Sequence, residues 1–421
     1  MLNYRLSAFI TLILLILVAG ACSNGIVDPD APIGELPRDL TPQEMMLVEA
    51  DRSFSYSIFK KTVAYDNEHE NIIISPLSIS MALAMTLNGA KGQTYTDMRN
   101  ALYLQGMETD EINEAFRSLI DLLVTADPKV AMRIANSIWH SDVFDVNQEF
   151  AGKMQSYFNA EVNAIDFLDP DAPNTINRWV ADKTEGLITE LLDEIEPDRI
   201  MYLINALYFK GDWLRQFDKD DTRRDNFRLE SGETIQVDMM SQQGLFATHF
   251  NYDENVQMIE LPYGDSLFAM SVLMPADPDT PIDQFIDRKI DADNLARWRS
   301  NLSVDMRKST IDMPKFELEY EIEYSDILKA MGMEIAFTPH AADLSGLSEQ
   351  GQNNLYLDEV IHKVFIRVDE EGTEAAAATS VGVMPTSMPP QMIVDRPFIF
   401  IIHERESGAN LFMGVVRDPS K

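Results

Sequence analysis

The most constraining feature of this chain is residues 370–390, a segment without a single aromatic residue, leucine or isoleucine. It follows an apolar, strand-like run at residues 360–368 and precedes another at residues 398–402. Side chains of this kind do not anchor a segment in a hydrophobic core. A connection of more than about 15 residues without regular structure is uncommon inside a compact domain and is usually functional. We therefore expect a long exposed loop with a specific role.

Read with a period of two, the same segment has the alternation of a β-strand. Alternate residues would lie on opposite faces of the strand, and we call each set a parity. One parity holds only small or β-branched side chains, and the other holds side chains that are better tolerated in water. The segment is therefore able to enter a sheet with one face buried and its charge facing outward. The alternative interpretation, a low-complexity Ala/Thr linker, rests on composition alone. The buried set is Thr373, Ala375, Ala377, Thr379, Val381 and Val383, and the outward set is Glu374, Ala376, Ala378, Ser380, Gly382 and Met384.

The pattern continues into the C-terminal part of the chain. Residues 370–379 read Glu-Glu-Gly-Thr-Glu-Ala-Ala-Ala-Ala-Thr, followed by Arg-Pro-Phe-Ile-Phe at residues 396–400 and Leu-Phe-Met-Gly at residues 411–414. Together these motifs resemble the hinge, the reactive centre loop and the C-terminal signature of the serpin family of protease inhibitors. The resemblance implies a reactive centre loop at about residues 370–395. The implied hinge comprises Glu370, Glu371, Gly372, Thr373, Glu374, Ala375, Ala376, Ala377 and Ala378.

Shorter matches in the order of the family extend the resemblance from about residue 41 to residue 419. They imply a shutter, which is a cluster of buried polar side chains where the central strands must part. Buried polar groups that are only half paired cost about 1–3 kcal/mol each, so such a cluster can hold two discrete arrangements. They also imply a breach under the top of the central sheet, where Lys315 pairs with Glu370. The implied shutter residues are Ser75, Ser78, Asn205 and His362, and the implied breach residues are Trp213 and Lys315.

Two of these residues also have plainer interpretations. His362 is a lone histidine in an apolar strand and is also read as a satisfied core residue, which is compatible with the shutter. Trp213 could be a platform on which a ligand stacks, but tryptophans are mostly buried and core packing is favoured. The chain has no His-Glu-x-x-His pair, no Gly-x-Ser-x-Gly elbow and no phosphate-binding glycine loop. We expect no catalytic residue, no metal site and no cofactor.

The N-terminus carries a targeting signal. Arg5 precedes an apolar run at residues 9–18, and small residues then lead into Cys22. The run is shorter than the roughly 20 residues that a membrane-spanning helix needs and is typical of a secretory signal peptide. It resembles a bacterial lipoprotein signal; a plain signal peptide with an unmodified Cys22 is the alternative. We expect a signal peptide at residues 1–21, a lipid on Cys22, a flexible tether over residues 22–40, and a location in the cell envelope at the outer membrane, facing the periplasm or the exterior.

The charge balance excludes several partners. The chain has 34 Lys and Arg against 69 Asp and Glu, a formal charge of -35. Nucleic acid and anionic membrane surfaces repel such a protein, so we expect no nucleic acid and membrane contact only through the lipid anchor. Some serpins recruit sulfated polysaccharide with a basic helix, but residues 94–124 are acidic here, and we expect no heparin-type cofactor. Cys22 is the only cysteine, which excludes an internal disulfide.

Helical patterns concentrate in the first half of the chain and hairpin signals in the second, without βαβ repetition, so the expected class is α+β. Thr41 and Glu44 predict a capping box at the start of the fold, and Ser78 predicts a second helix cap. The resemblance implies a serpin domain at residues 41–421, with a large central, mostly antiparallel sheet, two smaller sheets and about eight or nine helices. Expected helices lie at residues 79–87, 94–102, 109–124, 148–158 and 174–192, strands at residues 130–139, 162–167 and 201–208, and hairpin turns at residues 231–232, 264–265 and 406–410.

The resemblance implies an inhibitory serpin, which traps a protease as a covalent acyl-enzyme when its cleaved loop inserts into the central sheet. The spacing between Gly372 and Pro397 matches antitrypsin-like members and places the reactive bond between Thr386 and Ser387. Residues 368–395 contain no Lys or Arg, so a protease pocket that ends in a carboxylate has no cation to bind. The small Thr386 instead suits elastase-like and subtilisin-like serine proteases, and we expect the inhibitor itself to be a monomer.

Two other classes of function are also considered. A non-inhibitory serpin would serve as a binding or assembly protein. Such members tend to carry bulky, charged or proline residues at the inward hinge positions, whereas here these positions are small and uncharged, which favours the inhibitor. A lipid-anchored enzyme would need a nucleophile and a base, and the sequence offers neither.

Overall fold

The computed structural model describes residues 34–196, 199–305, 308–351, 354–373 and 391–421. Among these residues no helix combines the length and the apolar character that a membrane span requires. The signal peptide, Cys22 and most of the tether lie outside the described residues, as do the hinge from Glu374 to Ala378 and the reactive bond between Thr386 and Ser387.

The folded body begins with the capped helix that the sequence predicts. The Thr41 hydroxyl accepts a hydrogen bond from the backbone N–H of Glu44, and the Glu44 carboxylate accepts one from the N–H of Thr41. The next helix starts at Pro76, with Ser75 at the cap position. Proline suits the first turn because it lacks an N–H that would stay unpaired there, so the predicted cap at Ser78 is wrong. The described helices are α1 (Pro42–Tyr65), α2 (Pro76–Leu87), α3 (Gly92–Ala101), α4 (Thr109–Ala126), α5 (Gln148–Phe158), α6 (Ala172–Lys183), α7 (Ile282–Lys289), α8 (Ala292–Ser300) and α9 (Ser325–Leu328).

The helix expected over residues 174–192 is shorter in the structure. After α6, Gly186 has a φ of +80°, a left-handed conformation that glycine adopts at little cost. The chain then folds back, and the Asn177 side chain accepts hydrogen bonds of 2.9 Å from the N–H groups of Leu191 and Leu192. The apolar residues of this return segment therefore pack beside α6 instead of extending it.

Antiparallel hairpins dominate the second half of the chain. The predicted turns at residues 231–232, 264–265 and 406–410 each join two antiparallel strands, which confirms the three hairpins. The largest hydrogen-bonded sheet has the order β1-β17-β16-β9-β8-β7-β10, and a second has the order β15-β11-β6-β5. Their bounds are β1 (Ile72–Ile74), β5 (Arg223–Arg228), β6 (Thr234–Gly244), β7 (Ala247–Asn251), β8 (Val256–Pro262), β9 (Phe268–Met274), β10 (Ser303–Val304), β11 (Ser309–Pro314), β15 (Gln391–Ile393), β16 (Phe398–Glu404) and β17 (Asn410–Val416).

The central sheet is divided into two hydrogen-bonded parts. One has the order β14-β4-β2-β3, and the other is the antiparallel pair β12-β13. Among the described strands, β4 pairs with β2 along its length and with β14 only at Gly211 and Asp212, and β13 pairs only with β12. No ladder between described strands joins β4 to β13. The bounds are β2 (Val130–Ser141), β3 (Glu161–Ile165), β4 (Met201–Asp212), β12 (Phe316–Glu323), β13 (Ile361–Val368) and β14 (Gly372–Thr373).

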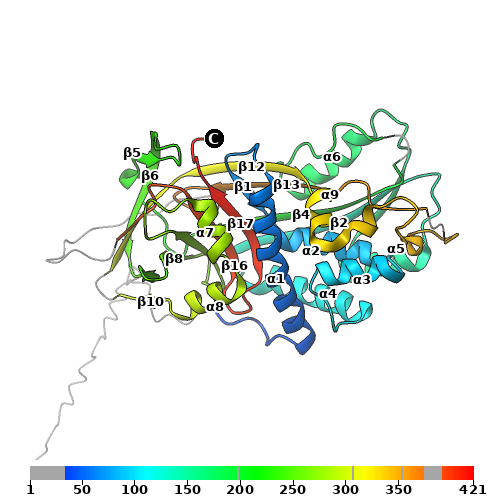
Figure 1. Ribbon diagram of the computed structural model, residues 1–421, viewed down its shortest axis with the longest axis horizontal. Coiled ribbons are helices and arrows are strands. Elements are labelled where there is room, and N and C mark those ends of the chain that lie inside the picture. The colour runs from blue at the N-terminus through cyan, green and yellow to red at the C-terminus, as the bar shows by residue number, and fades with distance from the viewer. Residues whose placement is uncertain (1–33, 197–198, 306–307, 352–353, 374–390) are drawn as a thin grey trace, which may run out of the picture. The chain divides into compact units, whose positions relative to one another are not determined.

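Helices cover both faces of the part that contains β4 (Figure 1). Side chains alternate along β4, so Leu203 belongs to the main core on the α2 side, whereas Ile204 packs in a separate cluster with Ile176 and Val180 of α6. The predicted α+β class is confirmed, and the described residues contain nine α-helices, as expected. The face toward α2 is the one that carries the predicted shutter residues.

Candidate functional site

The base of the loop is already joined to the central sheet. After β13, the chain turns at residues 369–371, and Gly372 and Thr373 pair antiparallel with Asp212 and Gly211 of β4. Two backbone hydrogen bonds hold the turn. The backbone N–H of Trp213 donates to the carbonyl of residue 371 at 2.9 Å, and the backbone N–H of residue 217 donates to the carbonyl of residue 370 at 2.8 Å. The hinge residues Gly372 and Thr373 therefore occupy the start of a strand beside β4.

Gly372 is required by this close approach. Its φ is +150°, and a Cβ atom at this position would lie 2.2 Å from the backbone oxygen of Gly211. That neighbour is main chain in a paired strand and cannot move aside at low cost. A glycine lets the two backbones meet.

Thr373 points into the structure, with 6% of its surface exposed. Its hydroxyl lies 3.1 Å from the hydroxyl of Tyr263, to which it is hydrogen-bonded. The Tyr263 ring stacks on Trp213 with 4.4 Å between ring centroids, and the Trp213 indole N–H donates to the Asp369 carbonyl at 2.9 Å. The predicted breach tryptophan is thus a packing and hydrogen-bonding residue. The outward partner in the alternation, Glu374, lies outside the described residues.

Two buried glutamates hold the turn. Lys315 Nζ lies 2.9 Å from a carboxylate oxygen of Glu370, and the Thr222 hydroxyl donates to the other oxygen at 2.7 Å. Burial alone would raise the pKa of Glu370, but these two hydrogen bonds outweigh it and lower the pKa. Glu371 forms an ion pair with Lys219 of the 3-10 turn η1 (Lys219–Asp221). We call this group of five side chains the hinge clasp. It consists of Glu370, Glu371, Lys315, Lys219 and Thr222.

The sequence predicted only part of the clasp. Lys315 and Glu370 were expected to pair, whereas Lys219 and Thr222 were missed. Lys219 stands among aspartates in a turn and has the pattern of a solvated surface residue. Its role depends on a contact across more than a hundred residues of chain, for which no local signal exists.

The predicted shutter residues form two separate groups. In one, the Ser78 hydroxyl donates to the Asn205 side-chain oxygen, and the Asn205 amide donates to Asn136 Oδ1 at 2.7 Å. In the other, the backbone N–H of Ser75 donates to His362 Nε2 at 3.0 Å. Asn136 was missed, although an Asn-Ser pair inside the apolar run at residues 130–139 was a visible signal. The first group belongs to β2, β4 and α2, and the second includes β13.

The shutter histidine is neutral. Burial lowers the pKa of His362 to about 3, and its Nε2 accepts a hydrogen bond, which requires an unprotonated nitrogen. The Ser75 hydroxyl is buried without a hydrogen-bond partner in the described part of the chain. This half-satisfied cluster costs free energy as it stands, so it favours a rearrangement that would complete its pairing.

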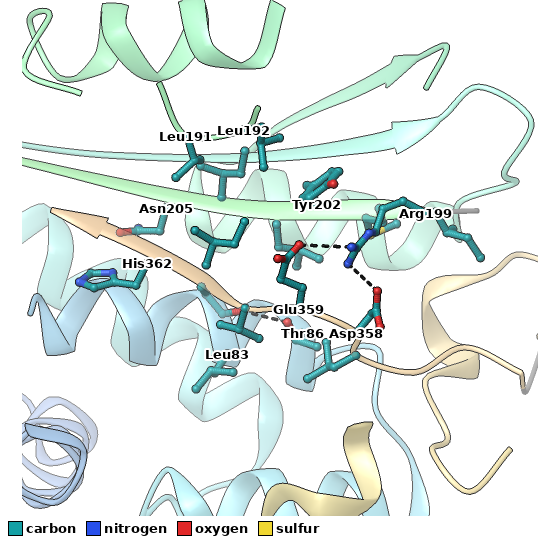
Figure 2. A pocket seen from close by; sticks show the side chains of 18 of the residues that line it. Leu83, Thr86, Leu191, Leu192, Arg199, Tyr202, Asn205, Asp358, Glu359 and His362 are labelled. Carbon is teal, nitrogen blue, oxygen red and sulfur yellow. Dashed lines mark hydrogen bonds and ion pairs between the residues drawn. The ribbon is translucent and has the colours of Figure 1, made fainter. Parts of the chain in front are cut away.

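A cavity of about 210 Å³ lies between β4 and β13 at the end where both strands begin, which we call the lower end (Figure 2). Its lining includes Ser78 of α2, Asn205 of β4 and His362 of β13, so both shutter groups face it. The space is closed at its other end by β14. We call this region, from β14 to the cavity, the insertion gap.

A serine, a histidine and a glutamate also meet in the largest sheet. Ser271 Oγ lies 2.9 Å from His403 Nε2, and the same nitrogen lies 3.3 Å from a Glu260 oxygen. A catalytic triad needs the serine and the carboxylate on opposite ring nitrogens, and here both face one. The three residues are 0%, 1% and 4% exposed, so no substrate reaches them. Within the described residues, no group of three or more His, Cys, Asp or Glu could hold a metal ion.

The chain was compared with known proteins. Residues 49–419 match the family described as Serpin (serine protease inhibitor). Human neuroserpin is 35% identical over 383 residues, which cover 88% of this chain and 91% of that protein. The leukocyte elastase inhibitor of Xenopus laevis is 33% identical over 89% of this chain and 99% of its own length. The native crystal structure of the thermophilic serpin tengpin has a TM-score of 0.80 and 30% identity over 90% of this chain and 95% of that chain.

The fold and these relatives define a protein of the protease-inhibitor class and not a catalytic enzyme. The chain belongs to the serpin family, and the predicted membership and fold are confirmed. The similar structures also include human thyroxine-binding globulin complexed with thyroxine, with a TM-score of 0.80 and 26% identity over 90% of this chain and all of that chain. Family membership alone therefore does not distinguish an inhibitor from a binding protein. The hinge and the insertion gap are the features that bear on this distinction.

The clasp predicts the behaviour of charge-reversal variants. We expect Glu370→Lys to increase polymer formation on mild heating, because it places a cation beside Lys315 and frees the base of the loop. The double variant Glu370→Lys/Lys315→Glu restores opposite charges and should recover part of the loss. Native gels after heating measure the polymer. Glu317→Lys is the control, since this neighbouring carboxylate is half exposed and surface pairs contribute only about 0–1 kcal/mol. Equal polymer in the control and in Glu370→Lys would contradict the clasp.

Proposed function

We propose that the protein is an inhibitory serpin that traps serine proteases of elastase-like or subtilisin-like specificity as covalent acyl-enzymes, by inserting its cleaved reactive loop into the central sheet. The observation that carries this proposal is the insertion gap: no ladder between described strands joins β4 and β13, and Gly372 and Thr373 already pair with β4 at one end. This arrangement supports the addition of a further strand that continues from β14.

The register of β14 on β4 defines how insertion would proceed. Gly372 opposes Asp212 and Thr373 opposes Gly211. Continued in the same antiparallel register, the loop would set Thr379 opposite Asn205 and Val383 opposite Met201. The new strand would therefore run the whole length of β4 and pass both shutter groups. Its other edge would meet β13, which runs antiparallel to it because the chain reverses at residues 369–371.

The free energy for trapping comes from strand pairing. Insertion of about 15 residues forms on the order of 15 ladder hydrogen bonds, each worth about 1 kcal/mol net, and it buries the β-branched side chains of the inward parity. The protease attacks the loop as a substrate and forms an ester with the residue before the cut. Because the two ends of the cut are no longer joined, the loop inserts and carries the attached protease away before water hydrolyses the ester.

The alternation of the hinge gives a sharp test. We expect Thr373→Arg to convert the protein from inhibitor to substrate, because residue 373 is buried beside Tyr263 and an unpaired charge there costs several kcal/mol. Glu374→Arg, of the outward parity, should retain most inhibition. Incubation with elastase-like and subtilisin-like proteases, followed by a denaturing gel, measures the covalent complex. If the wild-type protein forms no such complex, the proposed function is refuted; equal loss in both variants refutes the parity alone.

The reactive bond predicts a defined product. Cleavage between Thr386 and Ser387 should release a C-terminal fragment that begins at Ser387, which mass spectrometry identifies. Trypsin-like proteases should not react, because no Lys or Arg occurs between residues 368 and 395 to fill a pocket that ends in a carboxylate. A fragment that begins at Met384 would move the bond to a second site, and a cut within residues 373–379 would mean inactivation of the hinge.

We also propose that Cys22 carries a lipid that anchors the inhibitor to the outer membrane, where it meets its proteases as a monomer. The support is the short apolar run that leads into the only cysteine of the chain. Cys22→Ala should abolish incorporation of labelled fatty acid and move the protein from the membrane fraction to the soluble fraction. Labelling that persists in this variant would place the lipid elsewhere, and an unlabelled wild-type protein would support the plain signal peptide.

A further inference from the structure

The lower end of the insertion gap has an apolar wall made by separate parts of the chain. Leu83 comes from α2, Leu191 and Leu192 come from the segment that returns after α6, and Leu355 and Leu357 precede β13. Figure 2 shows Leu83, Leu191 and Leu192 around one space. An apolar cavity of about 150 Å³ is large enough for benzene, so a cavity of about 210 Å³ admits an alkyl chain of about six to eight carbons.

The rim of this cavity is acidic. Arg199 donates to two carboxylates at once, with 2.9 Å to Asp358 and 3.2 Å to Glu359. Glu196 and Glu323 add further negative charge around Glu359. Arg199 is thus paired with two carboxylates, and two further carboxylates lie around Glu359, so an additional cation would be attracted to this rim.

The second cation of the lining does not change this balance. Lys363 of β13 also lines the cavity, but it lies 3.1 Å from Glu319 and 2.9 Å from Glu321 of β12. Its charge is therefore already compensated by two carboxylates. Burial raises the pKa of Glu359. The charge of Arg199 lowers this pKa, but the surrounding carboxylates raise it further. A positive group placed beside this carboxylate would relieve the repulsion.

We propose that the cavity binds a small cationic amphiphile, a single alkyl chain of about six to eight carbons with a protonated amine, whose chain packs on the leucine wall and whose amine pairs with Glu359 and Asp358. Alkyl carboxylates fit the same wall but meet the acidic rim with the wrong charge. Charge complementarity thus selects the head group, and the cavity volume selects the length of the chain.

Such a ligand would regulate the inhibitor, a consequence that rests on the proposed function. The alkyl chain would occupy the space through which the inserted strand must pass at residues 379–383. Binding and insertion would therefore exclude each other, and by linkage the protein with an inserted loop should lose its affinity for the ligand. When the amphiphile is bound, the reaction with a protease should yield less of the stable covalent complex and more of the cleaved inhibitor.

The test uses calorimetry on the full native chain at neutral pH, with octylammonium, octanoate and 1-octanol at concentrations below micelle formation. We expect octylammonium to bind about tenfold more tightly than octanoate, because of the acidic rim. Affinity should rise about three- to fourfold per methylene from butylammonium to octylammonium, which is the usual gain for a buried methylene. No measurable binding of octylammonium, or binding of octanoate at equal strength, would overturn the proposal.

Two variants locate the site. Glu359→Gln should weaken octylammonium about tenfold and leave 1-octanol unchanged, whereas Glu68→Gln, the same charge change at an exposed residue outside the lining, should leave both unchanged. Ala82→Leu fills part of the cavity from α2 and should abolish binding of all three compounds. Retained binding in Ala82→Leu would show that the ligand sits elsewhere. Since binding is measured without a protease, loss of inhibition and loss of binding are separate results.

Discussion

The structure depends on an absent hydrogen-bond ladder. β4 and β13 line the same cavity, yet no described ladder joins them, and each pairs along its length with another strand, β2 and β12 respectively. Strand pairing contributes to the cohesion of a sheet, so in the proposed mechanism a further strand at this division would release free energy. The other features of the site lie along this gap: the hinge clasp at one end, the polar shutter in the middle and the apolar cavity at the other end.

The hinge clasp fixes the geometry of the turn, but it contributes only modestly to the free energy of folding. The carboxylates of Glu370 and Glu371 are 5% and 6% exposed, but their lysine partners Lys315 and Lys219 are 38% and 58% exposed. Water therefore screens one side of each ion pair, which reduces its contribution well below that of a fully buried pair. In the proposed mechanism, a restraint of this kind would hold the loop base in the native state and yield when the loop inserts. The half-paired shutter would act in the same direction, because it would lower the free-energy cost of separating the strands.

The serpin fold by itself is compatible with more than one use. Its similar structures include a mouse protease inhibitor dependent on protein Z as well as thyroxine-binding globulin with its bound thyroxine. What distinguishes an inserting loop is local chemistry. In this chain Gly372 permits the close approach to Gly211, and Thr373 is small enough to be buried against Tyr263. A bulky or charged residue at either position would block the first step of strand addition.

The sequence predicted much of the fold and part of the candidate site, because the sequence signals for these features are local. Helix periodicity, the Thr41 and Glu44 capping box, the hairpin turns and the alternating hinge each depend on neighbours a few residues apart. The end of α6 at Lys183, before the turn at Gly186, was missed because helix propensity continued past it. Ser78 was misread as a cap because its real partner, Asn205, lies on a distant strand. Only the tertiary structure could show that Lys219 pairs with Glu371 and that Asn136 joins the shutter. The same holds for the acidic-rimmed cavity between β4 and β13, two strands that no described ladder joins to each other. The physical reason is that these contacts join segments far apart in the chain, and their energies depend on burial and distance, which periodicity does not encode.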